Sequence, residues 1–167
     1  MRLIFLLLFG FISFSASHGQ QMIQEKAQEY VDAFIKSEFA KVASLTHPEL
    51  VAKNGGEDYV ISDLKAERIS SSAEGLLYNS GSVSEPAKII QHEGEIQAVV
   101  PVEYILQLVD TEYKNSSYLL AVSKDEGRTY TFVNLMQFDG GSLREFISNV
   151  SPDIIIPEGG DFVEISK

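Results

Sequence analysis

The 167-residue sequence contains no cysteine and no tryptophan. Without cysteine the chain can form neither a disulfide nor a thiolate metal site, so a packed core must supply its stability. Basic residues are also scarce: 13 Lys and Arg stand against 24 Asp and Glu, and the net charge is −11. Because this excess of negative charge repels phosphate backbones, we expect no nucleic-acid partner.

Long apolar runs are absent except at the N-terminus, where residues 3–14 (LIFLLLFGFISF) follow Arg2. Together with the small residues at 15–19 (SASHG), this pattern is typical of a secretory signal peptide. A dozen apolar residues is shorter than the roughly 20 that cross a bilayer, which disfavours the alternative of a membrane anchor. We predict a signal peptide over residues 1–19 and a mature chain that starts near Gln20. This mature chain would be periplasmic or secreted, with no membrane insertion after cleavage.

About 148 residues remain after the predicted cleavage, which is enough for one domain with a single core. We assign that domain to residues 20–150. Residues 151–167 contain Pro152, Pro157 and a Gly-Gly pair, so we expect an irregular tail packed on the domain, with the run 154–156 (III) buried.

The first half of the mature chain has helical periodicity. Apolar residues recur every three or four positions over residues 20–44, which predicts an amphipathic helix whose inner face carries Ile23, Ala27, Tyr30, Val31, Phe34 and Ile35. Three shorter helices should follow: one over 38–45 capped by Ser37, one that starts at Pro48 with Thr46 or His47 at its cap and ends at 54–56 (NGG), and one over 57–69.

From Gly75 onward the apolar period shortens to two, which indicates strands. The strongest predicted strand covers residues 95–110 and places its apolar residues on one face, whereas its other face, with Glu103, is partly wet. Pro101 in this strand favours a bulge or an edge-facing backbone. The other predicted elements are a weak strand 76–83 broken by Gly81, a strand 87–91, a turn 113–116, a hairpin 118–136 and a short helix 142–149 capped by Ser142 after a break at 139–141.

The predicted helices come first in the chain and the antiparallel strands follow them, and this order predicts an α+β fold. Specific segments carry a closer resemblance: YVDAF at 30–34, THPELV at 46–51, the Gly55-Gly56 pair, and SKDEGRTYTFV at 123–133. With these the chain resembles uncharacterised exported proteins of Bacteroidetes-type bacteria in the nuclear transport factor 2-like (cystatin-like) superfamily. The resemblance implies N-terminal helices packed against a curved, mostly antiparallel sheet, a conical cavity between them, and often a homodimer.

Residues 123–130 also match the Asp-box pattern S-x-D-x-G-x-T-W, with Tyr130 in place of Trp. The box recurs once per blade in sialidase-type propellers, and a single copy cannot build a propeller. We therefore interpret it as a structural turn in which Ser123 and Asp125 satisfy backbone groups, Gly127 takes a positive φ and Tyr130 packs beneath.

No catalytic set is evident in the sequence. His47 and His92 lack the spacing of metal ligands, so His47 is interpreted as a helix-entry residue, with a pocket acid or base as the alternative, and His92 as a turn residue. Glu103 would be a candidate base if buried, but the alternation places it on the wetter face. We expect no metal and no cofactor.

Two hypotheses follow. In the first, the protein is a non-catalytic module that binds a small apolar or amphipathic molecule, or a protein partner, in the cone. In the second, it is a small cofactor-independent isomerase or lyase, a hypothesis that rests on the resemblance alone. The candidate cavity residues are Tyr30, Phe34, His47 and Tyr104. A cavity with two titratable groups around a shared empty volume would favour the enzyme.

Overall fold

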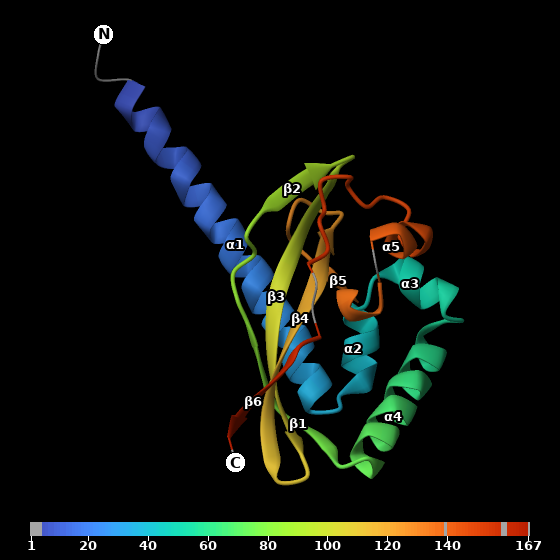
Figure 1. The fold of residues 1–167 in the computed structure, drawn as a ribbon. Coiled ribbons are helices and arrows are strands. Elements are labelled where there is room, and N and C mark those ends of the chain that lie inside the picture. Colours follow the sequence, from blue (N-terminus) through green and yellow to red (C-terminus); the bar gives the residue numbers. More distant parts are fainter. Residues whose placement is uncertain (1–4, 139, 158–159, 167) are drawn as a thin grey trace.

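The computed structural model describes residues 5–138, 140–157 and 160–166, with an α+β fold in which helices pack on a curved antiparallel sheet (Figure 1). This confirms the predicted fold class. The helices are α1 (Phe5–Ile35), α2 (Phe39–Leu45), α3 (Pro48–Lys53), α4 (Glu57–Ala73), the 3-10 helix η1 (Leu135–Gln137) and α5 (Gly140–Phe146). The strands are β1 (Leu76–Val83), β2 (Ile89–His92), β3 (Glu95–Leu108), β4 (Thr111–Ser123), β5 (Thr131–Asn134) and β6 (Phe162–Ser166).

Helix α1 runs without a break through the predicted cleavage point, and its first half projects beyond the sheet (Figure 1). Its second half buries the predicted apolar face, including Ile23, Ala27 and Val31. No helix in the described residues combines the length and apolar composition that a membrane crossing requires.

The sheet is built around the long hairpin of β3 and β4, which pair antiparallel from Ile96 with Ser123 to Leu108 with Thr111. Strands β1 and β2 pair along the outer edge of β3, whereas β5 and β6 pair along the outer edge of β4. The chain reverses at residues 109–110, where Val109 has a φ of +57°. The prediction of a turn at 113–116 is therefore wrong, because these polar residues are inside β4 and pair with both β3 and β6.

Pro101 occupies the gap that β1 and β2 leave on the edge of β3. The pairing with β1 stops at Val102 and the pairing with β2 stops at Ala98, so no strand faces the proline nitrogen on that edge. Its carbonyl accepts a hydrogen bond from Ser84 N at 3.0 Å. The expectation of an edge-facing backbone is confirmed, since a proline here removes no ladder hydrogen bond.

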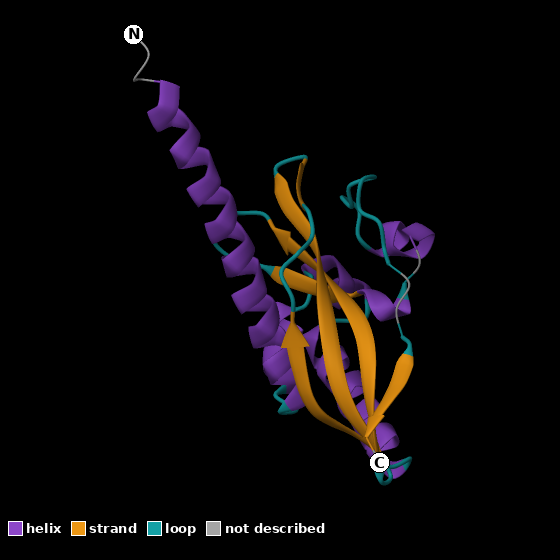
Figure 2. Cartoon of the chain, turned by 60° about the vertical axis from the view of Figure 1, so that its left-hand side comes forward, coloured by secondary structure: helices purple, strands orange, loops and turns teal. Residues whose placement is uncertain are grey.

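Two apolar clusters lie on opposite faces of the sheet (Figure 2). On the inner face, α1 packs against the odd-numbered residues of β4 and the even-numbered residues of β3, as with Val31, Val100 and Leu119. On the outer face, α5 and the segment after it cover Leu120 and Val122. Alternation along each strand thus assigns successive residues to different layers.

Strand β1 is continuous through Gly81, contrary to the predicted break. A Cβ atom at Gly81 would lie 2.4 Å from Val31 Cγ1 and 3.1 Å from Tyr104 Cδ1. The glycine therefore allows close packing of α1 on β1, and a register shift follows Tyr78 rather than Gly81.

Two predictions about the helix ends are wrong. Ser37 does not cap α2, because it takes a left-handed φ of +59° in the preceding turn and Glu38 occupies the cap position. Helix α5 starts at Gly140 and ends at Phe146, so Ser142 is inside it; Asp139 of the predicted break lies outside the described residues. His47 and Pro48 begin α3 as predicted.

The C-terminal segment is not an irregular tail, because residues 162–166 form β6 and pair with Glu112–Asn115 of β4. The apolar run in this segment is only partly buried: Ile154 is buried, whereas Ile155 is 78% exposed. The prediction that the whole run 154–156 is buried is therefore wrong.

Candidate functional site

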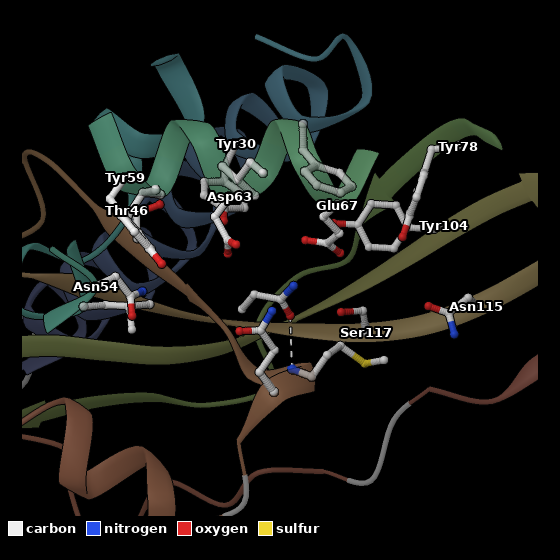
Figure 3. A pocket seen from close by; sticks show the side chains of 17 residues that line it. Tyr30, Thr46, Asn54, Tyr59, Asp63, Glu67, Tyr78, Tyr104, Asn115 and Ser117 are labelled. Carbon is white, nitrogen blue, oxygen red and sulfur yellow. Dashed lines mark hydrogen bonds between the residues drawn. The ribbon is translucent and has the colours of Figure 1, made fainter. Parts of the chain in front are cut away.

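A pocket of about 270 Å³ lies between α4, the end of α1 and the inner face of the sheet (Figure 3). Helix α1 contributes Tyr30 and Phe34, and strands β1, β3 and β4 contribute Tyr78, Tyr104, Asn115 and Ser117. Helix α4 closes the opposite side with Tyr59, Val60, Asp63, Leu64 and Glu67. The pocket therefore has an aromatic interior and a polar helix along one wall.

Four aromatic side chains are packed at one end of this pocket. The ring of Phe34 lies 5.2 Å from that of Tyr78 and 6.0 Å from that of Tyr104, in edge-on arrangements that aromatic pairs prefer. Tyr30 packs against Phe132 at 5.5 Å. Burial raises the pKa of Tyr30 to about 12 and raises that of Tyr104 as well, so both phenols stay protonated at neutral pH.

Two buried residues that line the pocket carry hydroxyl groups without a hydrogen-bond partner among the described residues. Tyr104 is 6% exposed and Ser117 is 2% exposed, yet neither side-chain oxygen forms a hydrogen bond with a described residue. They lie on paired strands, since Tyr104 is opposite Asn115 and Ser117 is two residues further along β4. Neither oxygen is sealed inside the protein, since among the described residues the one buried side-chain atom without a partner is His47 Nε2, so both hydroxyls can bond to a ligand or a water molecule in the pocket.

The pocket wall formed by α4 carries Tyr59, Asp63 and Glu67 at intervals of four residues, which places them on one face of the helix. All three side chains are exposed and Figure 3 shows both carboxylates directed toward the pocket. Neither carboxylate forms an ion pair or a hydrogen bond with a described residue. The adjacent Arg68 instead donates a hydrogen bond to Phe34 O at 2.7 Å.

Of the four predicted cavity residues, Tyr30, Phe34 and Tyr104 line this pocket, and His47 does not. The imidazole of His47 is turned to the other side of the chain, where it caps α3 by accepting a hydrogen bond from Glu49 N at 3.3 Å. The sequence interpretation missed Asp63, Glu67 and Ser117. The four-residue spacing of Tyr59, Asp63 and Glu67 is the signal that would have identified the helix face.

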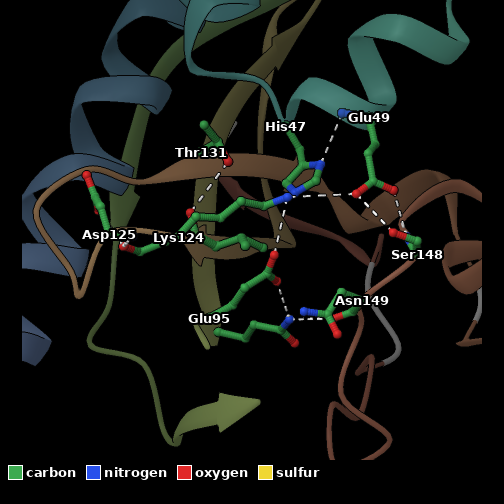
Figure 4. Close-up of polar contacts among 11 residues, drawn as sticks. His47, Glu49, Glu95, Lys124, Asp125, Thr131, Ser148 and Asn149 are labelled. Atoms are coloured by element: carbon green, nitrogen blue, oxygen red, sulfur yellow. Dashed lines mark hydrogen bonds and ion pairs between the residues drawn. The ribbon is translucent and has the colours of Figure 1, made fainter. Parts of the chain in front are cut away.

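His47 belongs to a second, polar cluster that joins α3, β3, the β4–β5 turn and the segment after α5 (Figure 4). Lys124 Nζ lies 3.3 Å from Glu95 Oε1 and 3.8 Å from Glu49 Oε1. Glu49 also accepts hydrogen bonds from Ser148 N and Oγ, and Gln97 receives one from Ser151 N at 2.9 Å. These contacts fasten the C-terminal segment to the sheet, which is a structural role.

The imidazole of His47 is fully buried and its Nε2 has no hydrogen-bond partner among the described residues. Burial lowers the pKa of His47 from its usual value near 6.5, the positive charge of Lys124 lowers it further, and Glu49 and Glu95 partly oppose the shift. The unfolded chain therefore binds this proton more readily than the folded chain does. The contribution of His47 to the free energy of unfolding is at its full value above about pH 6.5, and it is lost as the pH falls below that value.

Replacing His47 with asparagine is expected to flatten the dependence of stability on pH between about pH 7 and pH 5. Asparagine keeps a cap acceptor for Glu49 N but cannot be protonated. Urea unfolding at several pH values measures the effect, with His92→Asn as the control that retains the slope of the original protein. A slope that is unchanged in His47→Asn would contradict this account.

Hydrogen bonds between side chains and the backbone stabilise the β4–β5 turn. Ser123 Oγ accepts from Gly127 N at 2.9 Å, and Asp125 accepts from Thr129 N at 2.9 Å and from Thr129 Oγ1 at 2.7 Å. These bonds, with the backbone N–H of Thr129 foremost, lower the pKa of Asp125 to about 2. Gly127 has a φ of +86°, and Tyr130 is buried beside it. All of Asp125's partners lie within the turn.

The remaining candidates have structural partners. Glu103 forms an ion pair with Lys114 on the outer face of the sheet. No group of three or more His, Cys, Asp or Glu in the described residues is arranged to hold a metal ion. Comparison of the chain with protein-family models, with curated proteins and with solved structures found no match.

Proposed function

We propose that this protein is an exported, non-catalytic binding module that holds a small amphipathic molecule in the pocket between α1, α4 and the sheet. One observation supports the proposal above the others. The pocket combines aromatic walls with the hydroxyls of two buried residues, Tyr104 and Ser117, which have no hydrogen-bond partner among the described residues. A ligand whose ring packs against the aromatic walls and whose polar group bonds to the hydroxyls would fit both features of the pocket.

The order of the elements supports a related proposal, that the chain is a member of the nuclear transport factor 2-like superfamily. Helices α1 to α4 precede the strands, and α1 lies along the inner face of a curved sheet. On this proposal the pocket is the open end of the cone. Homodimer formation and cleavage near Gln20 belong to the same proposal.

A second candidate function is an isomerase or lyase, and one observation favours it. The protonated phenol of Tyr104 and the carboxylates of Asp63 and Glu67 line one pocket. A phenol can stabilise a developing oxyanion while a carboxylate accepts a proton. Both carboxylates are exposed to water, however, which weakens them as tuned bases, so the pocket supports binding better than chemistry.

The test is a nuclear magnetic resonance screen of the purified protein, labelled with ¹⁵N, against small ring compounds that carry hydroxyl, amine or carboxylate groups. Compounds that bind should shift the signals of Phe34, Tyr104 and Ser117. Tyr104→Phe should weaken binding of hydroxyl-bearing compounds about two- to tenfold, because it removes one hydrogen-bonding group and keeps the ring.

Tyr113→Phe is the matched control, because it makes the same chemical change on β4. Tyr113 lies outside the pocket lining, and its ring packs against Phe162. A screen in which no compound shifts the pocket signals would overturn the proposed function. Native mass spectrometry of the same preparation reports the mature mass, the subunit count and any ligand that is retained.

A further inference from the structure

We infer that the pocket selects a small ring compound that carries a positively charged amine and, at its other end, a hydroxyl or carbonyl group. The inference rests on the proposed function, since it names the chemical class of the ligand for the same pocket. Its basis is the arrangement of charge and hydrogen-bonding groups along the pocket, from the wall formed by α4 to the strands β3 and β4.

The charge on the pocket wall is negative and uncompensated. Asp63 and Glu67 are four residues apart on α4, and neither pairs with a described cation. The lining contains no Lys, Arg or His. Carboxylates in a pocket without a cation attract an ammonium group and repel a second carboxylate or a phosphate.

Arg68, next to Glu67 in the sequence, is outside the pocket lining, but its positive charge acts on two lining residues, since it partly opposes the rise in the pKa of Tyr78 and Tyr104 that burial causes. Its guanidinium donates to Phe34 O and lies 4.6 Å from the ring centres of both Phe34 and Tyr78. These contacts fix the guanidinium on the aromatic cluster. The positive charge of Arg68 is therefore held at the aromatic end of the pocket, and neither Asp63 nor Glu67 forms an ion pair with it or with another cation of the described residues.

The negative charge of Glu67 on α4 affects the pKa of tyrosines at the aromatic end of the pocket. After burial, the charge of Glu67 is a further cause of the raised pKa of Tyr30 and of Tyr78. Since Tyr30 is on α1 and Tyr78 on β1, the field of Glu67 reaches across the pocket to two other elements. A cationic ligand near Glu67 would gain from this charge, which Arg68 partly opposes at Tyr78.

Strands β3 and β4 supply neutral polar groups to the pocket. Tyr104 and Ser117 are buried residues whose hydroxyls have no hydrogen-bond partner among the described residues, and each hydroxyl can donate or accept a hydrogen bond. The rings of Phe34 and Tyr78 pack edge-on against each other and line the pocket as apolar walls. A phenol or a small cyclic ketone with an amine on a short side chain has this sequence of groups.

Three probes share a phenol ring and a two-carbon side chain and differ in the group at its end: tyramine carries an ammonium group, 4-ethylphenol carries no further group, and 3-(4-hydroxyphenyl)propionate carries a carboxylate. At low salt, tyramine should bind about three- to tenfold more tightly than 4-ethylphenol, and the propionate should bind most weakly. Because the carboxylates are exposed, added salt should reduce these ratios.

The double variant Asp63→Asn and Glu67→Gln should remove both the preference for tyramine over 4-ethylphenol and the disadvantage of the propionate. Glu74→Gln is the matched control, because it removes one negative charge at the C-terminal end of α4 outside the pocket lining and should preserve the preference for tyramine. Thermal unfolding of each variant confirms that the fold is retained.

The outcomes separate this inference from the function on which it rests. Equal binding of the three probes in the pocket, or a preference for tyramine that survives the double variant, would overturn the choice of an amine and leave the binding function intact. If none of the probes binds while other compounds of the screen do, the ligand class is wrong. If no compound of the screen shifts the pocket signals, the binding function itself fails.

Discussion

Replacing Phe132 with alanine is expected to destabilise the protein by about 3–5 kcal/mol, because the change removes a large, fully buried side chain and leaves a cavity. Phe132 lies on β5, packs against the ring of Tyr30 on α1, and accepts a hydrogen bond from His47 N through its carbonyl oxygen. It therefore joins the sheet, α1 and the start of α3. Urea unfolding followed by circular dichroism measures the loss.

Phe162→Ala is the control for this prediction, because the same atoms are removed from a side chain on β6 that is 58% exposed. Its effect should be within about 1 kcal/mol of zero. If the two variants lose the same stability, the core assignment of Phe132 is wrong.

Replacing Gly81 with valine is expected to cost about 1–3 kcal/mol or more, because the new side chain would overlap Val31 and press on Tyr104. The φ of Gly81 is not positive, so the cost comes from packing between α1 and β1 and not from the backbone. Since Tyr104 lines the pocket, the displaced ring should also weaken binding of ring compounds.

Ser82→Val provides the comparison on the same strand. Ser82 is exposed, and a β-branched residue suits a strand, so its unfolding midpoint should stay the same or rise slightly. Gly81→Ala should lie between the two. A valine at position 81 that leaves the midpoint and the pocket signals unchanged would contradict the close approach of α1 and β1.

The candidate site was partly predictable, and the reason differs from residue to residue. Tyr30, Phe34 and Tyr104 follow from periodicity, because inward-facing aromatic residues of α1 and β3 must meet where the helix crosses the sheet. His47 shows the limit of that argument. It is next to Thr46, which lines the pocket, but the cap of α3 turns its imidazole toward Glu49 N instead.

The misplaced elements have a similar cause. Residues 113–116 are polar but continue the hairpin with β3, whereas residues 162–166 are too short to be recognised as a strand alone and become one because Glu112–Asn115 of β4 pair with them. A strand at such a position depends on a neighbour far away in the sequence, which local propensity does not register.

By itself, the sequence of this protein determined the α+β class, the inner faces of α1 and β3, the cap of α3 and the tight turn at 123–130, since each depends on residues close together in the chain. Only the tertiary structure decided that α4 lies across the open side of the sheet. That position turns Asp63 and Glu67 from ordinary surface charges into the wall of a pocket, opposite hydroxyls from strands β3 and β4. The physical reason is that a site shared by three elements depends on their packing, which no local pattern encodes.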